Sequence, residues 1–138
     1  MAKTPSVIVS LRPPFVDERG SIQNLVDEPF TSVAVITCVK GSVRADHYHK
    51  TDYHYCWLAT GEMDYYHRPA GSAEKPVLER IRAGQLFYTP AMTEHTMHFL
   101  QDSVFYAFSR NNRETENYEA DIIRIPSLID AHKSGPPA

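Results

Sequence analysis

Short apolar and aromatic runs return along this 138-residue chain at close intervals, and Gly, Pro, Asp or Asn separates each run from the next. The runs are rich in Val, Ile, Tyr, Phe and Thr, and almost none has the period of an amphipathic helix. Strands this short and evenly spaced are typical of an all-β sandwich or barrel. We expect strands at residues 6–11, 21–27, 32–39, 43–49, 52–60, 62–68, 76–81, 85–90, 95–100, 103–110 and 121–125.

The chain is expected to form one domain, because its length suits a single core and no linker or internal repeat interrupts it. We assign residues 1–125 to the β-domain and residues 126–138 to a flexible C-terminal tail. Residues 68–75 read as a hairpin loop. Residues 111–120 read as a long polar connection with room for one helical turn.

Charge and composition exclude several functions. The net charge is −3, and no cluster of Lys and Arg forms the basic stripe that a nucleic-acid binder needs. The N-terminus lacks the apolar region of a signal peptide, and no run approaches the roughly 18 apolar residues of a membrane span. Cys38 and Cys56 each stand inside an apolar strand-like segment, which favours buried thiols in a reducing compartment. We therefore expect a cytoplasmic protein that binds neither nucleic acid nor membrane.

Histidine is concentrated in residues 41–61, "GSVRADHYHKTDYHYCWLATG", which hold His47, His49 and His54. Side chains alternate along a strand, so His47 and His49 share one face, and His54 returns after a turn with Cys56 on its side. His95 begins a later strand. In a small barrel these four histidines would converge on one point inside. The alternatives are solvent-exposed strand histidines, or a metal-free pocket that uses one or two of them as bases.

The spacing around these histidines resembles the two motifs of the cupin superfamily. Gly41, His47, His49 and Gly61 match the first motif, G-x5-H-x-H-x3,4-E-x6-G, with His54 in the position of its Glu. Gly84, Pro90 and His95 match the second, G-x5-P-x-G-x2-H-x3-N, and Met92 and Phe99 replace its last Gly and its Asn. The resemblance implies a double-stranded β-helix, which is the jelly-roll barrel of the cupins.

Cupins bind a divalent metal through the two His and the Glu of the first motif and the His of the second. Carried over by position, the ligands in this chain are His47, His49, His54 and His95. The exchange of Glu for His removes the only anion, and an all-imidazole set favours a transition metal over Mg²⁺ or Ca²⁺. We expect Zn, Ni or Fe, with Zn favoured, and no organic cofactor. His67, His98 and His132 lie outside the motifs and are expected at the surface.

A second resemblance concerns the sugar-nucleotide branch of the cupins, which includes dTDP-4-dehydrorhamnose 3,5-epimerases and dTDP-4-keto-6-deoxyglucose 3,4-ketoisomerases. The epimerases carry R-G-x-H and the ketoisomerases R-G-x-H-x-H-K, where this chain has residues 44–50, "RADHYHK", with Ala45 in place of the Gly. Their ending "YExDYIR" resembles residues 118–124, "YEADIIR". The resemblance implies an epimerase or ketoisomerase of a nucleotide-activated ketosugar, in deoxysugar or surface polysaccharide biosynthesis.

Such a reaction needs a base at the carbon next to a ketone and an acid or cation at the oxygen. In the relatives, the histidine matching His47 is the base, and in the ketoisomerases the one matching His49 also takes part. Arg44 and Lys50 are then candidates for binding substrate phosphate. If a metal occupies the histidines, a tyrosine, Glu94 or a metal-bound hydroxide would move the proton instead. Tyrosines on strands that should line or flank the pocket are Tyr53, Tyr55, Tyr65, Tyr66, Tyr88 and Tyr106; of these, Tyr55 is the candidate acid, and Tyr66, Tyr88 and Tyr106 are candidate substrate contacts.

Metal and metal-free mechanisms compete for His47, because a lone pair given to a metal cannot accept a proton. Two other functions remain open at this stage. The first is a metal-dependent oxygenase of a small molecule, and the second is a cupin that binds a sugar without catalysis. The resemblance also implies a homodimer in which N-terminal strands are paired or exchanged.

Overall fold

The computed structural model describes residues 4–134, and most of them lie in antiparallel strands. The strands are β1 (Ile8–Val9), β2 (Phe15–Asp17), β3 (Gly20–Ile22), β4 (Ser32–Cys38), β5 (Val43–His49), β6 (His54–Thr60), β7 (Glu62–Pro69), β8 (Val77–Arg82), β9 (Leu86–Thr89), β10 (Thr93–Phe99), β11 (Ser103–Ser109) and β12 (Ile122–Arg124). The helices are α1 (Thr115–Asp121) and α2 (Leu128–Ser134). The all-β prediction is confirmed, and the strands from β4 to β12 fall within a few residues of their expected positions.

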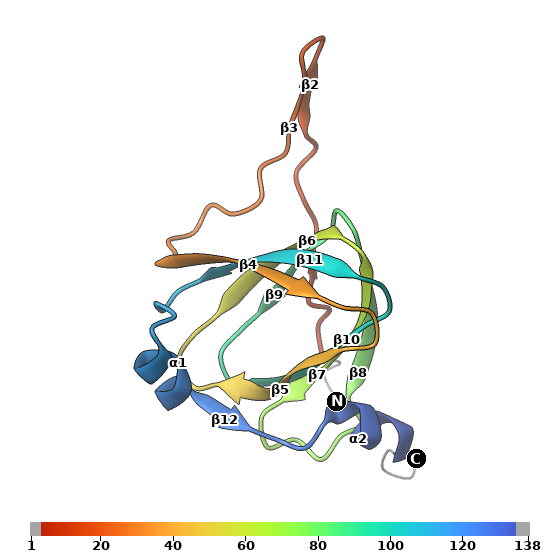
Figure 1. Ribbon diagram of the computed structural model, residues 1–138, viewed down its shortest axis with the longest axis vertical. Coiled ribbons are helices and arrows are strands. Elements are labelled where there is room, and N and C mark those ends of the chain that lie inside the picture. Colours follow the sequence, from red (N-terminus) through yellow and green to blue (C-terminus); the bar gives the residue numbers. More distant parts are fainter. Residues whose placement is uncertain (1–3, 135–138) are drawn as a thin grey trace.

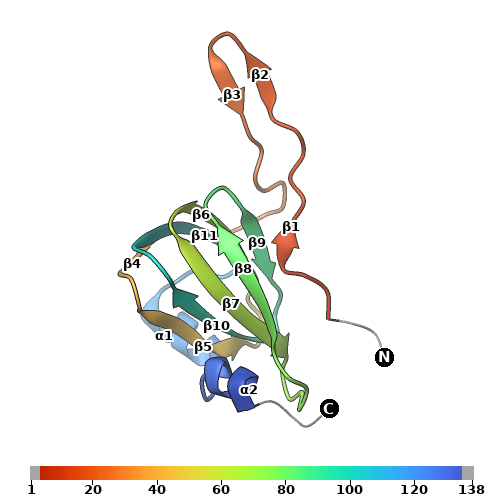
Figure 2. The same ribbon diagram turned by 90° about the vertical axis from the view of Figure 1, so that its right-hand side faces the viewer.

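Two five-stranded sheets form the barrel. One has the order β1-β9-β6-β11-β4 and the other β12-β5-β10-β7-β8. Neighbours in each sheet come from distant parts of the chain, as in a jelly roll. Figures 1 and 2 show the two sheets facing each other, with α1 at one end of the barrel beside β5 and β12. The expected jelly-roll barrel is therefore present.

The core lies between the sheets, because each strand turns alternate apolar side chains inward. Along β6, for example, Cys56 and Leu58 are buried while Tyr55 and Trp57 are only partly covered. The apolar and aromatic residues with 0% exposure come from five different strands, and they are Leu58, Met63, Tyr65, Ile81, Leu86, Phe87 and Phe99. Cys38 and Cys56 are buried free thiols, as expected.

The C-terminal segment differs from the expected tail over residues 128–134, which form helix α2. Leu128 is 1% exposed, and its backbone N–H donates to Thr96 Oγ1 at 3.1 Å. An apolar side chain and this hydrogen bond hold the helix against β10 and β7. Residues 135–138 of the expected tail lie outside the described residues. Neither helix in residues 4–134 is long and apolar enough to span a membrane.

Strands β2 and β3 form a separate two-stranded arm, which Figures 1 and 2 show extending away from the barrel. The sequence pattern does not predict strand β2, because it is only three residues long and directly follows Pro13 and Pro14. The arm exposes three large apolar side chains: Phe15 is 59%, Val16 67% and Ile22 68% exposed. A lone hairpin is at best marginally stable in water. This arm therefore presents an apolar surface that the described residues of the chain do not cover.

Candidate metal and active site

Four histidines meet inside the barrel, and they are the four that the cupin motifs select. His47 on β5 is the direct cross-strand partner of His95 on β10, and their ring centroids lie 4.9 Å apart. The ring of His49 lies 4.8 Å from that of His47 and 4.4 Å from that of His54. Each of the four is at most 7% exposed. This burial excludes the alternative that these four are solvent-exposed histidines on strands.

An irregularity in β5 shapes the approach to His47. His95 pairs with His47 and Thr96 with Ala45, so Asp46 has no partner across the ladder and forms a β-bulge. Asp46 Oδ1 instead accepts a hydrogen bond from Thr96 Oγ1 at 2.7 Å. Ala45 and Asp46 both have positive φ, 76° and 54°. Ala45, which stands where the sugar-nucleotide motif has Gly, therefore adopts the left-handed backbone that glycine tolerates best. Met92, where the second motif has Gly, likewise has a φ of 61°.

The substitution Ala45→Gly is expected to stabilise the fold by about 0.5 to 1 kcal/mol. A side chain in the left-handed region costs roughly 1–2 kcal/mol, and the larger entropy of unfolded Gly cancels only part of that gain. Denaturant unfolding measures the difference. The matched control is Ala120→Gly in α1, which should lose about 1 kcal/mol, because glycine weakens a helix. A loss of stability in Ala45→Gly would contradict the argument.

Hydrogen bonds decide which nitrogen of each ring is free. His95 Nδ1 lies 2.9 Å from the carbonyl oxygen of Thr93, which can only accept, so Nδ1 carries the hydrogen and Nε2 is bare. His49 Nδ1 lies 3.3 Å from Asp121 Oδ2, which likewise leaves Nε2 unprotonated. His49 Nε2 is buried and has no hydrogen-bond partner in the described part of the chain. A nitrogen that binds a metal has no hydrogen-bond partner among the protein atoms, and His49 Nε2 has this property.

Asp121 accepts a hydrogen bond from Nδ1 of His49 and fixes the orientation of that ring. Its Oδ1 accepts from the backbone N–H of Thr51 at 2.9 Å and from Thr51 Oγ1 at 2.6 Å. Its Oδ2 accepts from the backbone N–H of Asp52 at 3.1 Å as well as from His49. Burial raises the pKa of Asp121, but these donors outweigh it and the pKa is lowered. Asp121 thus stays ionised and orients His49.

His54 differs from the other three histidines. Its Nε2 lies 2.9 Å from Oδ2 of Asp52, whose Oδ1 accepts from the backbone N–H of Asn111 at 2.9 Å. Two groups of side chains have ligand atoms within 4.8 Å of one another: His47, His49 and His95 form one, and His49, Asp52 and His54 form the other. His49 belongs to both groups, so His54 lies beside the three imidazoles and differs from them in its bond to the Asp52 carboxylate.

The surroundings keep the three imidazoles neutral. Burial, followed by repulsion from His49 and His54, lowers the pKa of His47 to about 3. Burial and His54 lower the pKa of His49 to about 4, although Asp52 and Asp121 oppose the shift. Burial, followed by the charge of His47, holds the pKa of His95 well below its ordinary value. Metal binding needs neutral imidazole, and these rings provide it at neutral pH.

The metal-free protein is expected to lose stability steeply in mild acid. Unfolded histidine takes up a proton near pH 6.5, whereas folded His47, His49 and His95 resist protonation. Stability is therefore complete above pH 6.5 and falls as the pH drops toward the folded pKa values. Each such histidine contributes a slope of up to about 1.4 kcal/mol per pH unit.

Denaturant unfolding in chelator at pH 7, 6 and 5 measures this slope. Replacing His95 by Asn should remove at most about a third of it, because burial also lowers the pKa of His67, which adds to the slope. Equal stability at pH 7 and pH 5 would show that the buried rings do not resist protonation.

A cavity of about 150 Å³ opens over these histidines, and α1 supplies its cover. His47, His54 and His95 line it, together with Arg113 and Tyr118. The Tyr118 ring lies 5.7 Å from the ring of His49, and the guanidinium of Arg113 lies 4.7 Å from the centre of the Tyr118 ring. Sequence reasoning assigned neither residue to the site, although Tyr118 opens the "YEADIIR" stretch that resembles the sugar-nucleotide enzymes.

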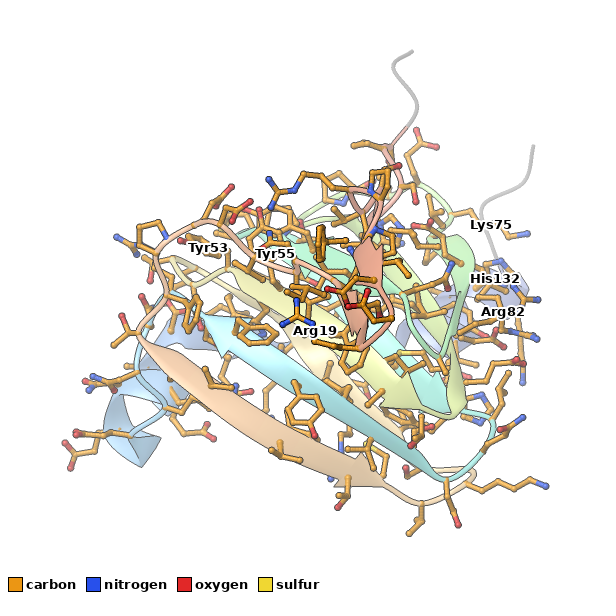
Figure 3. The ribbon with its side chains drawn as sticks, turned by 90° about the horizontal axis from the view of Figure 1, so that it is seen from above. Arg19, Tyr53, Tyr55, Lys75, Arg82 and His132 are labelled. Carbon is orange, nitrogen blue, oxygen red and sulfur yellow. The ribbon has the colours of Figure 1, made fainter. Side chains whose placement is uncertain are left out.

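Of the predicted tyrosines, Tyr65 packs against one of the four histidines, with its ring centroid 6.0 Å from that of His95, but the candidate acid and the candidate substrate contacts do not reach them. Tyr55 follows the inward-facing His54 and so points outward, where its hydroxyl donates to Glu28 Oε1 at 2.9 Å. Figure 3 shows Tyr55 beside Tyr53, and burial, followed by the hydrogen bond to Glu28, raises the pKa of Tyr55 to about 12. The others pack elsewhere: Tyr88 against Tyr55, Tyr106 against Trp57, and Tyr66 against His132. Strand alternation, applied from His54, gives the correct side for Tyr55.

Glu94 also lies outside the cluster. It precedes the inward-facing His95, and its Oε1 accepts from Arg68 Nε at 2.8 Å. This ion pair joins neighbouring strands on the outer side of the sheet. Glu94 is therefore occupied by Arg68 and lies away from the cavity over the histidines.

The two predicted phosphate contacts lie in different hollows. Arg44 lines the histidine cavity, but its Nη2 donates to the Thr37 carbonyl at 2.9 Å and its Nε to Cys38 Sγ at 3.1 Å. Lys50 lines a second hollow on the other side of α1.

His67 was expected at the surface and is instead 1% exposed, because it continues the inward side of β7 after Tyr65. Its Nε2 bonds Glu79 Oε2 at 2.6 Å.

The residues present fit a transition metal. Three neutral imidazoles converge and their donor atoms are nitrogen alone. One of those nitrogens is buried and has no hydrogen-bond partner within residues 4–134. Nitrogen donors favour zinc, nickel, copper or iron over magnesium or calcium. The buried histidines are thus able to hold such an ion.

No protein-family model and no curated protein matches the sequence. Solved structures do match the fold. A sugar 3,4-ketoisomerase, QdtA from Thermoanaerobacterium thermosaccharolyticum in complex with TDP, is 16% identical with a TM-score of 0.68, over 92% of this chain and 93% of that one. The dTDP-4-dehydrorhamnose 3,5-epimerase from Elizabethkingia anophelis is 20% identical with a TM-score of 0.68, over 83% and 75%. The capsular polysaccharide assembling protein CapF from Staphylococcus aureus is 17% identical with a TM-score of 0.64, over 86% of this chain and 33% of that one.

At these identities the likeness establishes the fold, which is that of the RmlC-like cupins. The cupin resemblance read from the two motifs is confirmed at this level.

Proposed function

We propose that this cupin-fold chain is an isomerase or epimerase that moves a proton at the carbon next to the ketone of a nucleotide-activated ketosugar. The observation that carries the proposal is the division of the buried histidines. Three imidazoles stand ready for a metal, and a fourth, His54, is bonded to a carboxylate in the same cavity. A site with an electrophile and an oriented base beside each other suits the formation and collapse of an enolate.

His47, His49 and His95 would hold the metal, with zinc favoured. When bound there, the metal supplies a Lewis acid for the ketone oxygen. Asp121 orients His49 through Nδ1, and the Thr93 carbonyl orients His95 in the same way. Both contacts turn Nε2 toward the point where the three imidazoles meet. They fix the orientation of the two rings and raise the basicity of Nε2.

His54 would move the proton. Asp52 accepts the hydrogen on Nε2 at 2.9 Å, so Nδ1 carries the lone pair that takes a proton from carbon and later returns it. The Asp52 carboxylate then stabilises the imidazolium. Burial raises the pKa of Asp52, but its hydrogen bonds to His54 and to the Asn111 N–H lower the pKa by more. The net shift is downward, which keeps the carboxylate ionised. Because His54 is outside the set of three, no histidine has to serve both as ligand and as base.

Tyr118 and Arg113 would close the cavity over the sugar. Their stacked contact forms a cover that excludes water from the reacting carbon. The substrate class is supported by analogy: neighbours of the same fold act as a ketoisomerase, seen with TDP, and as a dTDP-sugar epimerase. We extend that analogy to deoxysugar or surface polysaccharide biosynthesis.

Proton exchange in D₂O tests the function. The protein, loaded with zinc, is incubated with a panel of nucleotide 4-ketosugars, and NMR follows each C–H next to the ketone. We expect one position to exchange in one member of the panel. If no position exchanges above the rate without enzyme, epimerase and ketoisomerase chemistry are both excluded.

We also propose a homodimer formed through the β2–β3 arm, since its exposed Phe15, Val16 and Ile22 need a partner surface. Light scattering after size exclusion should give twice the chain mass of 15.7 kDa. The variant Phe15→Asp with Ile22→Asp should give the monomer. A monomeric parent protein would refute the dimer.

The free buried thiols of Cys38 and Cys56 support a place in the reducing cytoplasm.

A further inference from the structure

The backbone directly before His47 is strained. Ala45 and Asp46 are consecutive residues with positive φ, 76° and 54°, a conformation that residues other than glycine rarely adopt. Strained backbone of this kind persists only where the surrounding structure holds it in place, and it is concentrated at functional sites. The contacts that hold the β-bulge at Asp46 therefore decide how the strand enters the site.

Three hydrogen bonds hold the bulge. Thr96 Oγ1 donates to Asp46 Oδ1 at 2.7 Å and accepts from the Leu128 N–H at 3.1 Å. The Ile125 N–H donates to the Asp46 carbonyl at 3.0 Å. Thr96 is 0% exposed and follows the inward-facing His95, so its side chain points to the outer side of the sheet, where α2 packs on β10. Figures 1 and 2 show α2 outside the barrel. We call Asp46, Thr96, Ile125 and Leu128 the Thr96 latch.

The bulge decides which side chains of β5 reach the cavity over the histidines. In a regular strand, residues three positions apart face opposite sides, so Arg44 and His47 could not line one cavity. Here both line it. The reason is the register: His95 pairs with His47, but two residues further on, Met97 pairs with Arg44 where an unbroken ladder would give Ala45. Loss of the bulge would shift one side of β5 by one residue and turn its side chains over.

The Thr96 latch also joins the two strands that carry the paired ligands. Asp46 precedes His47 on β5, and Thr96 follows His95 on β10. The hydrogen bond between Asp46 and Thr96 therefore ties the strands together one residue beyond the two imidazoles. A ligand set is only as well ordered as the groups that support it.

We propose that Thr96 is a positioning residue of the metal site: through Asp46 it holds the bulge that turns both His47 and Arg44 into the cavity. Helix α2 takes part through the Leu128 N–H, so the C-terminal segment belongs to the support of the site. That the bound metal serves an isomerase rests on the proposed function; the placement of His47 by the latch does not.

Two substitutions of Thr96 test the proposal in the full chain, with competition for zinc against a chromogenic chelator as the measurement. Thr96→Val keeps the shape of the side chain and loses the hydroxyl, and it should weaken zinc binding by about tenfold or more. Thr96→Ser keeps the hydroxyl and should bind zinc nearly as the parent does, although the lost methyl group lowers the stability of the fold. A residue that only stabilised the fold would leave the zinc affinity of both folded variants unchanged.

The partner residue gives a second, independent comparison. Asp46→Asn keeps an oxygen that can accept from Thr96, and asparagine tolerates positive φ, so its zinc affinity should be close to that of the parent. Asp46→Ala should lose as much affinity as Thr96→Val. The double variant Asp46→Ala, Thr96→Val should be no weaker than either single variant, because all three lack the same bond. If Thr96→Val does not fold, the two Asp46 variants carry the comparison.

Amide hydrogen exchange in chelator examines the bulge without metal or substrate. Thr96→Val should speed exchange of the amides of residues 44–47 by about tenfold, the effect of one lost hydrogen bond. The control is Ser103→Ala, which removes a buried hydroxyl that donates to the Gln101 carbonyl at 2.8 Å. Ser103 lies at the end of β11 away from His54, so neither exchange at residues 44–47 nor zinc binding should change.

The proposal is overturned if Thr96→Val binds zinc as the parent does, if serine fails to restore the affinity, or if the losses in the double variant add. Failure of the latch and failure of the proposed function give different results. Zinc affinity that depends on Thr96, with no proton exchange in any ketosugar, would refute the enzyme and keep the latch. Proton exchange in a ketosugar by a protein whose zinc affinity is the same with and without the Thr96 hydroxyl would refute the latch and keep the enzyme.

Discussion

Replacing His54 by Asn is expected to slow exchange of the substrate C–H by about 10²- to 10⁴-fold, the usual contribution of a general base, while the metal stays bound. The expectation follows from the geometry of His54. Its Nε2 is bonded to Asp52, and it lies outside the set formed by His47, His49 and His95. Asparagine keeps an amide N–H for Asp52 and removes the nitrogen that would accept the proton.

Two measurements on the same sample decide the outcome. NMR in D₂O gives the exchange rate, and mass spectrometry gives the metal content of protein purified without a His-tag. The matched control is His98→Asn, because His98 lies on the same face of the barrel wall as Glu94, opposite to His95. Loss of metal together with activity would make His54 a ligand, as the cupin motif alone predicts. Retention of full activity would exclude it as the base.

Replacing His95 by Asn is expected to weaken zinc binding by at least about 100-fold. Loss of a group that merely orients a ligand typically costs 10- to 100-fold, and His95 is itself one of three converging imidazoles. The Asn amide can still donate to the Thr93 carbonyl, so the fold keeps the hydrogen bond that His95 Nδ1 makes at 2.9 Å. The loss should therefore report on the metal and not on packing.

Competition with a chromogenic chelator measures the affinity without any activity assay. The zinc affinity of the Asp121→Asn variant should lie between that of the parent and that of His95→Asn. We expect it to be about 10- to 100-fold weaker than in the parent, since this change removes only the carboxylate that orients His49. Zinc at 100 times its dissociation constant should stabilise the parent by about 2.7 kcal/mol and the His95→Asn variant far less. A parent protein that contains and binds no metal would refute the metal site, and His47 would then be free to act as the base.

Most of the barrel was predictable because its strands follow a local rule. Alternation between inward and outward side chains has a period of two, and the turn residues between runs mark where each strand ends. The same rule places His47 and His49 on one face and His54 on the inner side of the next strand. It also places Tyr55 and Glu94 on the outer side, because each is adjacent to an inward-facing histidine, whereas residue type alone makes both of them catalytic candidates.

The helices were harder to predict for a different reason. Helix α1 is only seven residues long and mostly polar, so no apolar period marks it. Helix α2 depends on one buried side chain, Leu128, and on its bond to Thr96 from a distant strand. Short elements of this kind are stabilised by what they pack against, and a single sequence does not show those contacts.

By itself, the sequence determined the all-β fold, the cupin register and the meeting of four histidines, because strand alternation and turn spacing act over a few residues. Only the tertiary structure decided how those histidines are divided. Asp121 reaches His49 across 72 positions of the chain, and the backbone of Asn111 fixes Asp52 across 59. These contacts place a carboxylate behind the rings of His49 and His54 and bring Tyr118 over the cavity. They depend on where α1 and the turn between β5 and β6 come together in space, which no local pattern encodes.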